Sequence, residues 1–375
     1  MTAETTLALH HSLDDIAADE WDRLAGKHPF TRHAFLQALH QSGCASPQTG
    51  WTPLCLTLTR EDKLVGALLL YLKRHSRGEY VFDHAWAEAY QRNGLLYYPK
   101  LLGAVPFTPV SGPRLLAHDA ADKVALARAA IVLAQQNKLS SLHILFPSEE
   151  DTAAFEAAGY MIREGVQFHW RNAGYATMAE FLGYMAREKR KKILQDRRRV
   201  EREGISFEWI RGQDITAQDL DFFYECYALT YFQHGNPPYL TRDAFAGIHA
   251  ALPDDLLLII ARDAGERVAV ALNVVDGQTV YGRYWGATRF VSGLHFETCY
   301  MQAIEYCIVN GLACFEGGAQ GEHKIARGLL PVITRSAHWI GDPRFAAAIS
   351  EFLDSERTAV GDYRDELDTH SPFKN

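Results

Sequence analysis

One short segment of the chain concentrates side chains that can do acid–base chemistry. After an apolar run, the chain reads Glu316-Gly317-Gly318-Ala319-Gln320-Gly321-Glu322-His323-Lys324, and Arg327 follows shortly after. Glycines let a backbone turn sharply and approach a ligand closely. An acid, an imidazole and a cation at the end of a strand supply what proton transfer and oxyanion stabilisation require. The segment 316–327 is therefore the first candidate for an active site.

The side chains of this segment suggest complementary roles. His323 is the best general base, because the unperturbed pKa of an imidazole lies near neutrality. Glu316 or Glu322 would orient His323 or act as the base through a water molecule. Lys324, or the amides of the glycines, would stabilise an oxyanion. We expect His323, Lys324 and Glu316 to be catalytic, and the choice between the imidazole and a carboxylate as base stays open.

Two further polar side chains stand at the start of a helix predicted for Leu294–Asn310. Gly293 immediately precedes this helix and is part of its start signal. Glu297 is another catalytic candidate, although a carboxylate in the first turn also interacts favourably with the helix dipole. His295 either binds substrate or is simply half-buried.

A strand predicted for Tyr281–Ala287 leads towards that helix. Successive side chains of a strand point to opposite faces, so that one of Tyr284 and Trp285 packs and the other lines a cleft. The turn after the strand brings an arginine and a glycine to the helix start, where free amides bind anions. The candidates for binding substrate or carrier are Arg283, Trp285, Arg289, Gly293 and His295.

A strongly basic helix is predicted for Arg187–Glu203. The segment holds nine basic and four acidic residues, and Ile193 and Val200 mark one apolar stripe along it. Such a charge run is either a solvated helical face or a surface that binds phosphates. Lys191 and Arg198 are the phosphate-binding candidates on this helix.

The elements around these residues form a pattern that occurs twice. Pro53–Lys73 and Leu256–Asp276 each read as a hairpin of two apolar strands around a charged turn. Each hairpin is later followed by an amphipathic helix and a short apolar strand. The repetition predicts a mixed α/β fold with two tandem domains, residues 1–165 and 166–375, with the main site in the second.

Composition limits the class of protein. The chain has 375 residues, a net charge of −8 and a pI of about 6.1, so it does not bind nucleic acid through its overall charge. Its six cysteines show no zinc-type spacing, and we expect no metal. No secretory signal and no membrane-spanning run is visible, which predicts a cytoplasmic protein. No P-loop, zincin or hydrolase-elbow motif occurs.

The chain resembles a tandem GNAT (acyl-CoA N-acyltransferase) architecture, because it contains twice a hairpin, an arginine-bearing turn into a helix and a short strand. Phe155–Tyr160 is similar to the helix-ending signature of GNAT chains. The stretch Leu294–Glu297, the glycine segment 316–324 and Arg327–Pro331 resemble the FemAB-like predicted N-acyltransferases. The resemblance covers most of the chain and is most specific in this last stretch.

This resemblance implies two GNAT-like domains and a role for Lys324, which with Gly328 matches a lysine context of Fem-type aminoacyltransferases. It implies transfer of an acyl group from acyl-CoA to an amine on a small molecule or peptide. The basic helix also resembles Fem-type chains, for which the donor is aminoacyl-tRNA. The turn Arg289–Gly293 lacks the full glycine-rich pyrophosphate signature of a GNAT.

Three functions are therefore open from the sequence. The first is an acyl-CoA-dependent N-acyltransferase, which the glycine segment and its imidazole favour. The second is an aminoacyl-tRNA-dependent transferase of the same fold, which the basic helix favours. The third is a binding protein with a degenerate transferase fold, which would hold a ligand without turnover.

Overall fold

The computed structural model describes residues 5–319 and 321–374. Gln320 of the glycine segment and the ends of the two predicted domains, 1–4 and 375, lie outside the described residues. The chain forms two compact units. Unit 1 comprises Met1–Gly165 and Ile333–Gly361, and unit 2 comprises Val166–Val332 and Asp362–Asn375.

The C-terminal region therefore does not belong wholly to unit 2. Strand β13 (Leu330–Ile340) and the long helix α12 (Pro343–Thr369) contribute most of their residues to unit 1. Only the end of α12 and the residues after it return to unit 2. The division into two GNAT-like domains at 165/166 stays a prediction, and the return of 333–361 is a feature that the sequence did not indicate.

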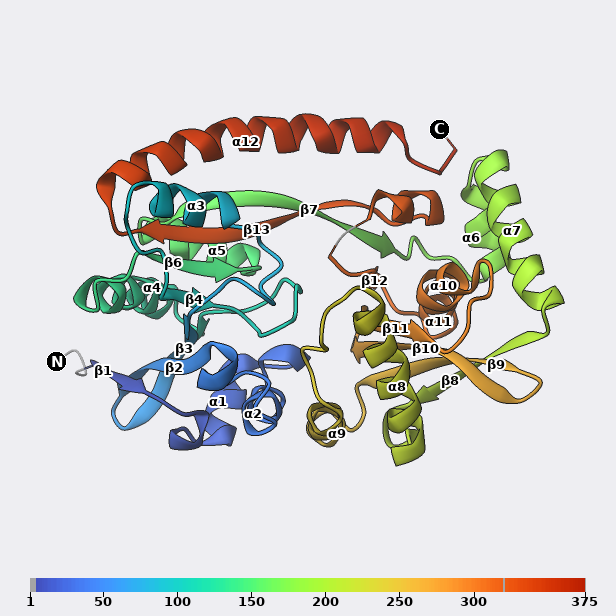
Figure 1. The fold of residues 1–375 in the computed structure, drawn as a ribbon, viewed down its shortest axis with the longest axis horizontal. Helices are drawn as coiled ribbons and strands as arrows, with labels where there is room; N and C mark the ends of the chain where they lie inside the picture. Colours follow the sequence, from blue (N-terminus) through green and yellow to red (C-terminus); the bar gives the residue numbers. More distant parts are fainter. Residues whose placement is uncertain (1–4, 320, 375) are drawn as a thin grey trace. The chain divides into compact units, whose positions relative to one another are not determined.

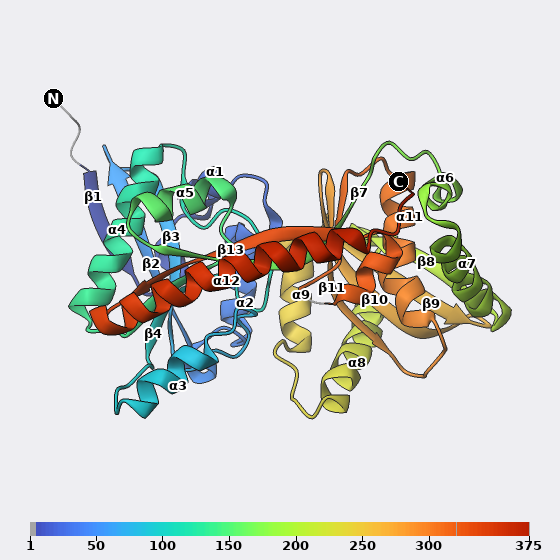
Figure 2. The same cartoon turned by 90° about the horizontal axis from the view of Figure 1, so that it is seen from above.

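Unit 1 is a mixed sheet with helices packed against it (Figures 1 and 2). Its strand order is β1-β2-β3-β4-β6-β13, and β5 pairs with β3. The strands are β1 (Thr5–His10), β2 (Trp51–Arg60), β3 (Lys63–Lys73), β4 (Lys100–Gly103), β5 (Leu116–Ala117) and β6 (Ser141–Leu145). The helices are α1 (Ala18–Ala25), α2 (His33–Gln41), α3 (His84–Arg92), α4 (Ala120–Gln136) and α5 (Glu149–Ala157), with short 3₁₀ turns at Leu13–Asp15, Pro29–Thr31 and Pro47–Thr49.

In unit 2 the strands follow the order β7-β12-β11-β10-β9-β8. The strands are β7 (Met161–Arg171), which begins in unit 1, β8 (Ile205–Arg211), β9 (Leu256–Asp263), β10 (Glu266–Asp276), β11 (Thr279–Ala287) and β12 (Cys314–Glu316). The helices are α6 (Met178–Tyr184), α7 (Arg187–Arg202), α8 (Ala217–Gln233), α9 (Arg242–Ala251), α10 (Leu294–Phe296), the π-helix η5 (Glu297–Met301), α11 (Gln302–Val309) and the 3₁₀ helices η4 (Gly212–Asp214) and η6 (Glu322–Arg327).

The elements predicted from the sequence are present. The two hairpins are β2–β3 and β9–β10, both antiparallel. In unit 1 the second hairpin strand, β3, pairs with β4, and β4 pairs in parallel with β6. In unit 2 the second hairpin strand, β10, pairs with β11, and β11 pairs in parallel with β12. The prediction of a mixed α/β fold is confirmed, whereas superposition of the two halves stays a prediction.

Two layers of apolar side chains hold the sheet of unit 2 in place. On one face, η5 and α11 bury Met301, Ile304 and their neighbours against β9 and β10. On the other face, α8 lies against β11 and β10 (Figure 1). The strand segment Leu256–Ala261 is apolar at every position, without alternation, because side chains on both faces of the strand are buried.

The contact between α8 and β11 requires a glycine. A Cβ atom at Gly286 would lie 2.1 Å from the backbone oxygen of Cys226 on α8. We expect Gly286→Ala to lower the free energy of unfolding by about 1–3 kcal/mol, because α8 must shift away from the strand. Thermal unfolding of the full chain measures this loss. Gly277→Ala is the matched control, since no atom lies within 4 Å of its added Cβ; equal melting temperatures for the two variants would contradict the prediction.

None of the helices within the described residues is both long enough and apolar enough to cross a membrane.

Candidate functional site

The candidate site lies in unit 2, where two parallel strands part. β11 and β12 pair only over Thr279–Tyr281 and Cys314–Glu316. β11 then continues to Ala287, whereas β12 ends at Glu316 and the chain turns away through Gly317 and Gly318. A cavity of about 150 Å³ occupies the gap.

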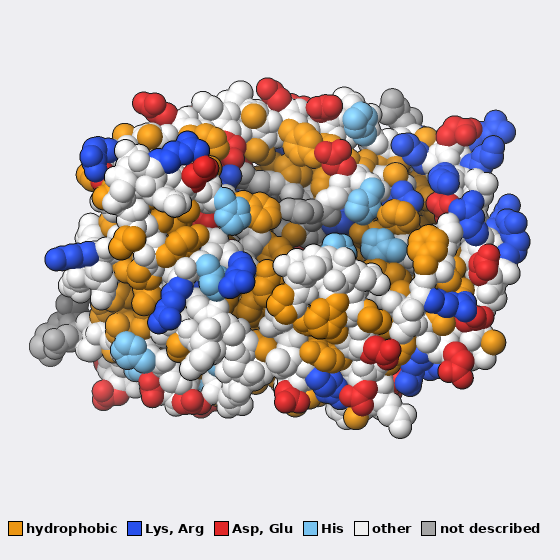
Figure 3. Space-filling view, in the orientation of Figure 1, with side chains coloured by type: hydrophobic (Ala, Val, Ile, Leu, Met, Phe, Trp, Pro, Cys, Tyr) orange, Lys and Arg blue, Asp and Glu red, His pale blue; other side chains and the backbone are white. Residues whose placement is uncertain are grey.

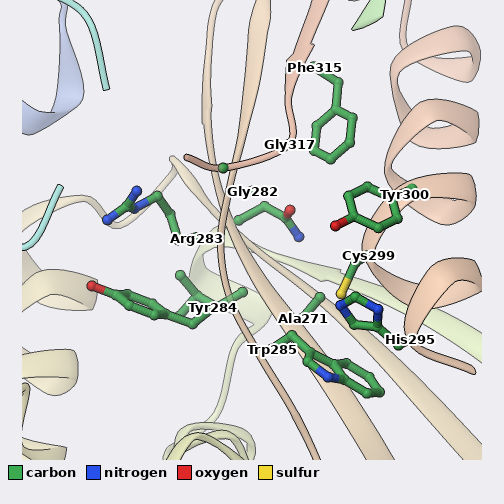
Figure 4. Close-up of a pocket in the computed structure, with 13 residues that line it drawn as sticks. Ala271, Gly282, Arg283, Tyr284, Trp285, His295, Cys299, Tyr300, Phe315 and Gly317 are labelled. Carbon is green, nitrogen blue, oxygen red and sulfur yellow. The ribbon is translucent and has the colours of Figure 1, made fainter. Parts of the chain in front are cut away.

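Three elements line this cavity (Figure 4). Strands β10 and β11 form one side, His295 of α10 and the π-helix form another, and the end of β12 with its glycines forms a third. The lining residues are Ala271, Leu272, Asn273, Gly282, Arg283, Tyr284, Trp285, His295, Cys299, Tyr300, Phe315, Gly317 and Gly318. The predicted binding residues Arg283, Trp285 and His295 are among them.

A β-bulge interrupts the sheet at the cavity. Asn273 lies opposite Gly282 and Leu272 lies opposite Tyr284, so that Arg283 is an extra residue on β11. A bulge leaves its extra residue outside the regular hydrogen-bond ladder. The bulge therefore brings an irregular stretch of the β11 backbone to the cavity wall.

The helix predicted over Leu294–Asn310 is present but is not a regular α-helix. It consists of α10, the π-helix Glu297–Met301 and α11. π-helical turns are rare and occur frequently at functional sites. Here the π-helix places Cys299 and Tyr300 on the cavity wall. Sequence periodicity did not reveal it, because one wider turn scarcely changes the spacing of apolar residues.

His323 lies in η6 and reaches the cavity wall through a neighbour. Its Nε2 lies 3.3 Å from the hydroxyl of Tyr300, and its ring packs edge-on against Phe296. His323 is exposed, but partial desolvation of its ring and the charges of Lys324 and Arg327 lower its pKa below the usual 6.5. The imidazole is therefore neutral at pH 7 and able to accept a proton.

Lys324 is buried beneath the glycines that follow β12. Its side chain is 2% exposed, and its Nζ donates a hydrogen bond of 2.8 Å to the carbonyl oxygen of Gly318. Burial lowers the pKa of this ammonium to about 8. Gly317 allows the close approach, because a Cβ there would lie 2.6 Å from Leu329 and 3.5 Å from the Lys324 side chain.

Glu316 lies on the opposite face of β12 from the cavity-lining Phe315. It stands between His169 on β7 and Tyr281 on β11 in the sheet register. Its Oε2 is 3.8 Å from His169 Nε2 and has no hydrogen-bond partner among the described residues. Burial and the nearby carboxylate of Asp276 raise the pKa of Glu316 to about 7. A carboxyl group that titrates near neutrality is a possible base, but it does not touch His323.

Two other acidic candidates are engaged elsewhere. The hydroxyl of Tyr363 donates a 2.5 Å hydrogen bond to Glu322, which is exposed. The carboxylate of Glu297 lies 3.1 Å from Arg197 of α7 and accepts a hydrogen bond from Gln302. Burial raises the pKa of Glu297, and the Arg197 charge opposes that shift. Glu297 does not line the cavity, and its contacts tie the basic helix to the π-helix.

His295 forms part of the cavity wall beside Trp285, with 5.3 Å between the ring centroids. Burial, together with the charges of His323 and Lys324, lowers the pKa of His295 to about 4. It is therefore a neutral ring at pH 7 and suits binding better than proton uptake.

The predicted phosphate-binding residues lie away from the cavity lining. Arg289 forms a 2.5 Å ion pair with Asp263, and Gly293 has the positive φ of +89° that starts α10. Lys191 and Arg198 are exposed on α7, and within the described part of the chain neither forms an ion pair. Figure 3 shows lysine and arginine side chains gathered over α7 at the right-hand edge.

The described residues do not bring three or more His, Cys, Asp or Glu side chains together in a way that could hold a metal ion.

Unit 1 differs at the place where its own parallel strands end. β4 and β6 pair over Leu101–Gly103 and Leu142–Ile144. Beyond them, the buried guanidinium of Arg114 donates to the carbonyl oxygens of Leu145 and Val110, at 2.9 and 2.7 Å. The cavity beside it is about 20 Å³. Arg114 thus fills the space beyond the ends of β4 and β6 in unit 1.

Comparison with solved structures shows the same fold in other proteins. A crystal structure of FemX matches with a TM-score of 0.55 and 14% identity, covering 92% of this chain and 100% of that chain. The C-terminal domain of a putative lysylphosphatidylglycerol synthetase from Agrobacterium fabrum matches with a TM-score of 0.52 and 10% identity, covering 91% and 97%. L-PGS from Bacillus licheniformis matches with a TM-score of 0.52 and 11% identity, covering 90% and 97%. At these identities the likeness shows the fold alone.

A comparison with curated protein sequences found no match. A family model, FemAB-like, described as peptidoglycan biosynthesis/recognition, matches residues 12–375. This match spans nearly the whole chain and includes both units. The chain therefore belongs to the FemAB-like family, and it is a transferase.

Proposed function

We propose that the protein is an N-acyltransferase that moves an acyl group from acyl-CoA to an amine. Membership of the FemAB-like family supports transfer of an acyl or aminoacyl group. The observation that carries the proposal is the cavity between the parted strands β11 and β12, with the Tyr300–His323 pair and Lys324 beside it. A thioester bound in this cavity would have a base and a cation near its carbonyl.

The reaction requires four changes at the carbonyl carbon and the amine. The amine loses a proton, its nitrogen forms a bond to the carbonyl carbon, the carbonyl oxygen becomes negative for a moment, and the C–S bond breaks to release the thiolate. In our proposal His323 accepts the proton, directly or through the Tyr300 hydroxyl. Lys324, or the amides of the glycine segment after β12, stabilise the negative oxygen, because such donors are most effective away from bulk water.

We propose an amino acid, peptide or other small amine as the acceptor, since the description of the family names peptidoglycan biosynthesis. The neutral state of His323 at pH 7 supports this role, because a base must hold no proton when the amine arrives. Glu316, which titrates near pH 7, is the alternative base.

One observation favours a second candidate, aminoacyl-tRNA as the donor. The exposed cations of α7 form a surface that could follow a phosphate backbone (Figure 3). In this case the cavity would receive the aminoacyl group and α7 would bind the RNA.

Native mass spectrometry of the freshly purified full chain tests the two donors. A mass increase of a CoA thioester, lost on addition of an amine mixture with release of free thiol, is the expected result. Bound material that absorbs near 260 nm and disappears with ribonuclease would select aminoacyl-tRNA instead. Tight binding of acetyl-CoA without thiol release for any amine would contradict a transferase function at this site.

The basic helix allows a separate prediction. We expect Lys191→Ala combined with Arg198→Ala to weaken carrier binding roughly tenfold at low salt and to reduce its salt dependence, since each lost phosphate contact lowers the salt slope. Thermal stability should barely change, because exposed charges contribute little to it. Lys63→Ala, an exposed cation of unit 1, is the control. Unchanged binding in the double variant would show that α7 takes no part.

A further inference from the structure

Asn273 is a polar side chain in an apolar layer. It lies on β10 between Ala271 and Val275, and all three point to the face that packs against η5 and α11. Its cross-strand neighbour Leu257 is also fully buried. Burying an amide among apolar groups costs free energy unless the amide is hydrogen-bonded. The presence of a buried asparagine at this position therefore calls for a hydrogen-bonding partner.

The described residues offer the side-chain amide of Asn273 only one long hydrogen bond. Asn273 is 1% exposed, and its Nδ2 donates only to the carbonyl oxygen of Leu257 across 3.5 Å, the outer limit for a hydrogen bond. No described residue donates a hydrogen bond to its Oδ1. Asn273 lines the cavity beside Gly282. An acceptor oxygen is thus available at the cavity wall.

Most of the other side chains of the wall carry no charge at pH 7. At pH 7 His295 is neutral because its pKa is about 4, and burial raises the pKa of the Cys299 thiol and of the Tyr300 hydroxyl, so both keep their protons. Arg283 is the one charged group among the lining residues, and its guanidinium lies 5.2 Å over the ring of Tyr284. Figure 4 shows Arg283 and Tyr284 on one side of β11, and His295, Cys299 and Tyr300 on the other.

A cation would be repelled. Besides burial, the charges of Lys324 and Arg327 lower the pKa of His295, so that positive charge lies near its ring. An ammonium group beside His295 would be repelled by the same charges. A carboxylate would have to leave water for a wall of aromatic rings and an acceptor oxygen.

We propose that Asn273 is a specificity-determining residue, whose Oδ1 accepts a hydrogen bond from a neutral O–H or N–H group of the ligand that enters the cavity. The inference rests on the proposed function in taking this ligand as the acyl arm of a carrier. The donor group is either a hydroxyl on the acyl group itself or an amide N–H of the carrier arm. A plain hydrocarbon would leave Oδ1 buried without a partner, at a cost of about tenfold in affinity.

The first experiment uses two small probes that differ in one property. Butan-2-ol donates a hydrogen bond, whereas butan-2-one has nearly the same shape and only accepts. Isotope labelling of the tryptophan indoles gives one NMR signal for each of the seven tryptophans, and Trp285→Phe identifies the signal from the cavity. We expect butan-2-ol to bind about tenfold more tightly than butan-2-one, and Asn273→Leu, which keeps the branched side-chain shape without the amide, to remove this difference.

Equal affinities of the two probes for the natural chain would overturn the inference without need of any variant. A preference that persists in Asn273→Leu, or no shift of the Trp285 signal with either probe, would overturn it as well.

A second arm identifies the source of the donor group. Calorimetric titration with 3-hydroxybutyryl-CoA and butyryl-CoA compares an acyl group with and without a hydroxyl. Tighter binding of the hydroxylated thioester places the acyl hydroxyl at Asn273. If both thioesters bind equally and Asn273→Leu weakens both about tenfold, the amide of the carrier lies at Asn273. If both bind equally and the variant changes neither affinity, the inference is contradicted. If neither thioester binds while the probes still differ, acyl-CoA is not the donor and the Asn273 subsite stands.

Discussion

His323→Ala is expected to lower turnover by about two to four orders of magnitude, the usual contribution of a positioned acid or base. The affinity for the carrier should stay nearly the same, because the imidazole serves the proton of the acceptor amine. Single-turnover kinetics with the carrier already bound measure this loss separately from binding. His323→Gln is the matched control, since it keeps a hydrogen-bonding group near the Tyr300 hydroxyl without a usable base.

The pH profile separates the two possible bases. A base works only when it is unprotonated, so the rate falls as the pH drops through its pKa. With His323 as the base, this fall occurs below pH 6.5, because burial and its cationic neighbours lower its pKa. With Glu316 as the base, the fall occurs near pH 7 and is absent from Glu316→Gln. Near-normal turnover of both His323 variants would assign His323 a structural role and favour Glu316.

Lys324→Met is expected to lower turnover by about two to three orders of magnitude, as removal of one oxyanion donor does in other enzymes. The variant removes a buried charge and the hydrogen bond from Nζ to Gly318. Methionine is an unbranched side chain that fills irregular gaps, so the fold around the glycines should persist. Stopped-flow measurement of the chemical step, with the melting temperature as a check on folding, tests the prediction.

For Lys324 the rate should change with pH in the opposite direction from that expected for a base. The lysine stabilises an oxyanion only while it is protonated, and its pKa is about 8, so the rate of the natural protein should fall as the pH rises through that value. Lys324→Arg keeps the charge and should lose this alkaline fall while retaining part of the activity. An alkaline fall that is unchanged in Lys324→Met would show that Lys324 only holds the loop.

Much of the local structure could be predicted from the sequence. The hairpins β2–β3 and β9–β10, the basic helix α7 and the glycine that starts α10 are all present near their predicted bounds. These features depend on contacts between residues close in the chain, namely turns, caps and the alternation of apolar side chains. The segment around His323 and Lys324 was also found in this way, because its glycines and charged groups are neighbours in sequence.

The details of the site depend on contacts that the sequence does not display. The bulge at Arg283 arises from the pairing of β11 with β10, and the π-helix places Tyr300 against His323, which lies beyond β12. Glu316 faces away from the cavity because strand alternation gives that side to Phe315. Glu297, a catalytic candidate from its position in a helix, instead pairs with Arg197 of a distant helix.

Asn273 shows most clearly what only the tertiary structure decided. In the sequence it is one polar residue in the apolar strand β10, and nothing near it in the chain marks it as functional. Its burial, its nearly unsatisfied amide and its place on the cavity wall result from the packing of η5 and α11 on the sheet. The sequence by itself determined the elements, the mixed α/β class and the reactive segment, because those depend on local patterns. The tertiary structure decided which side chains meet, because the contacts of a buried site join strands and helices far apart in the chain.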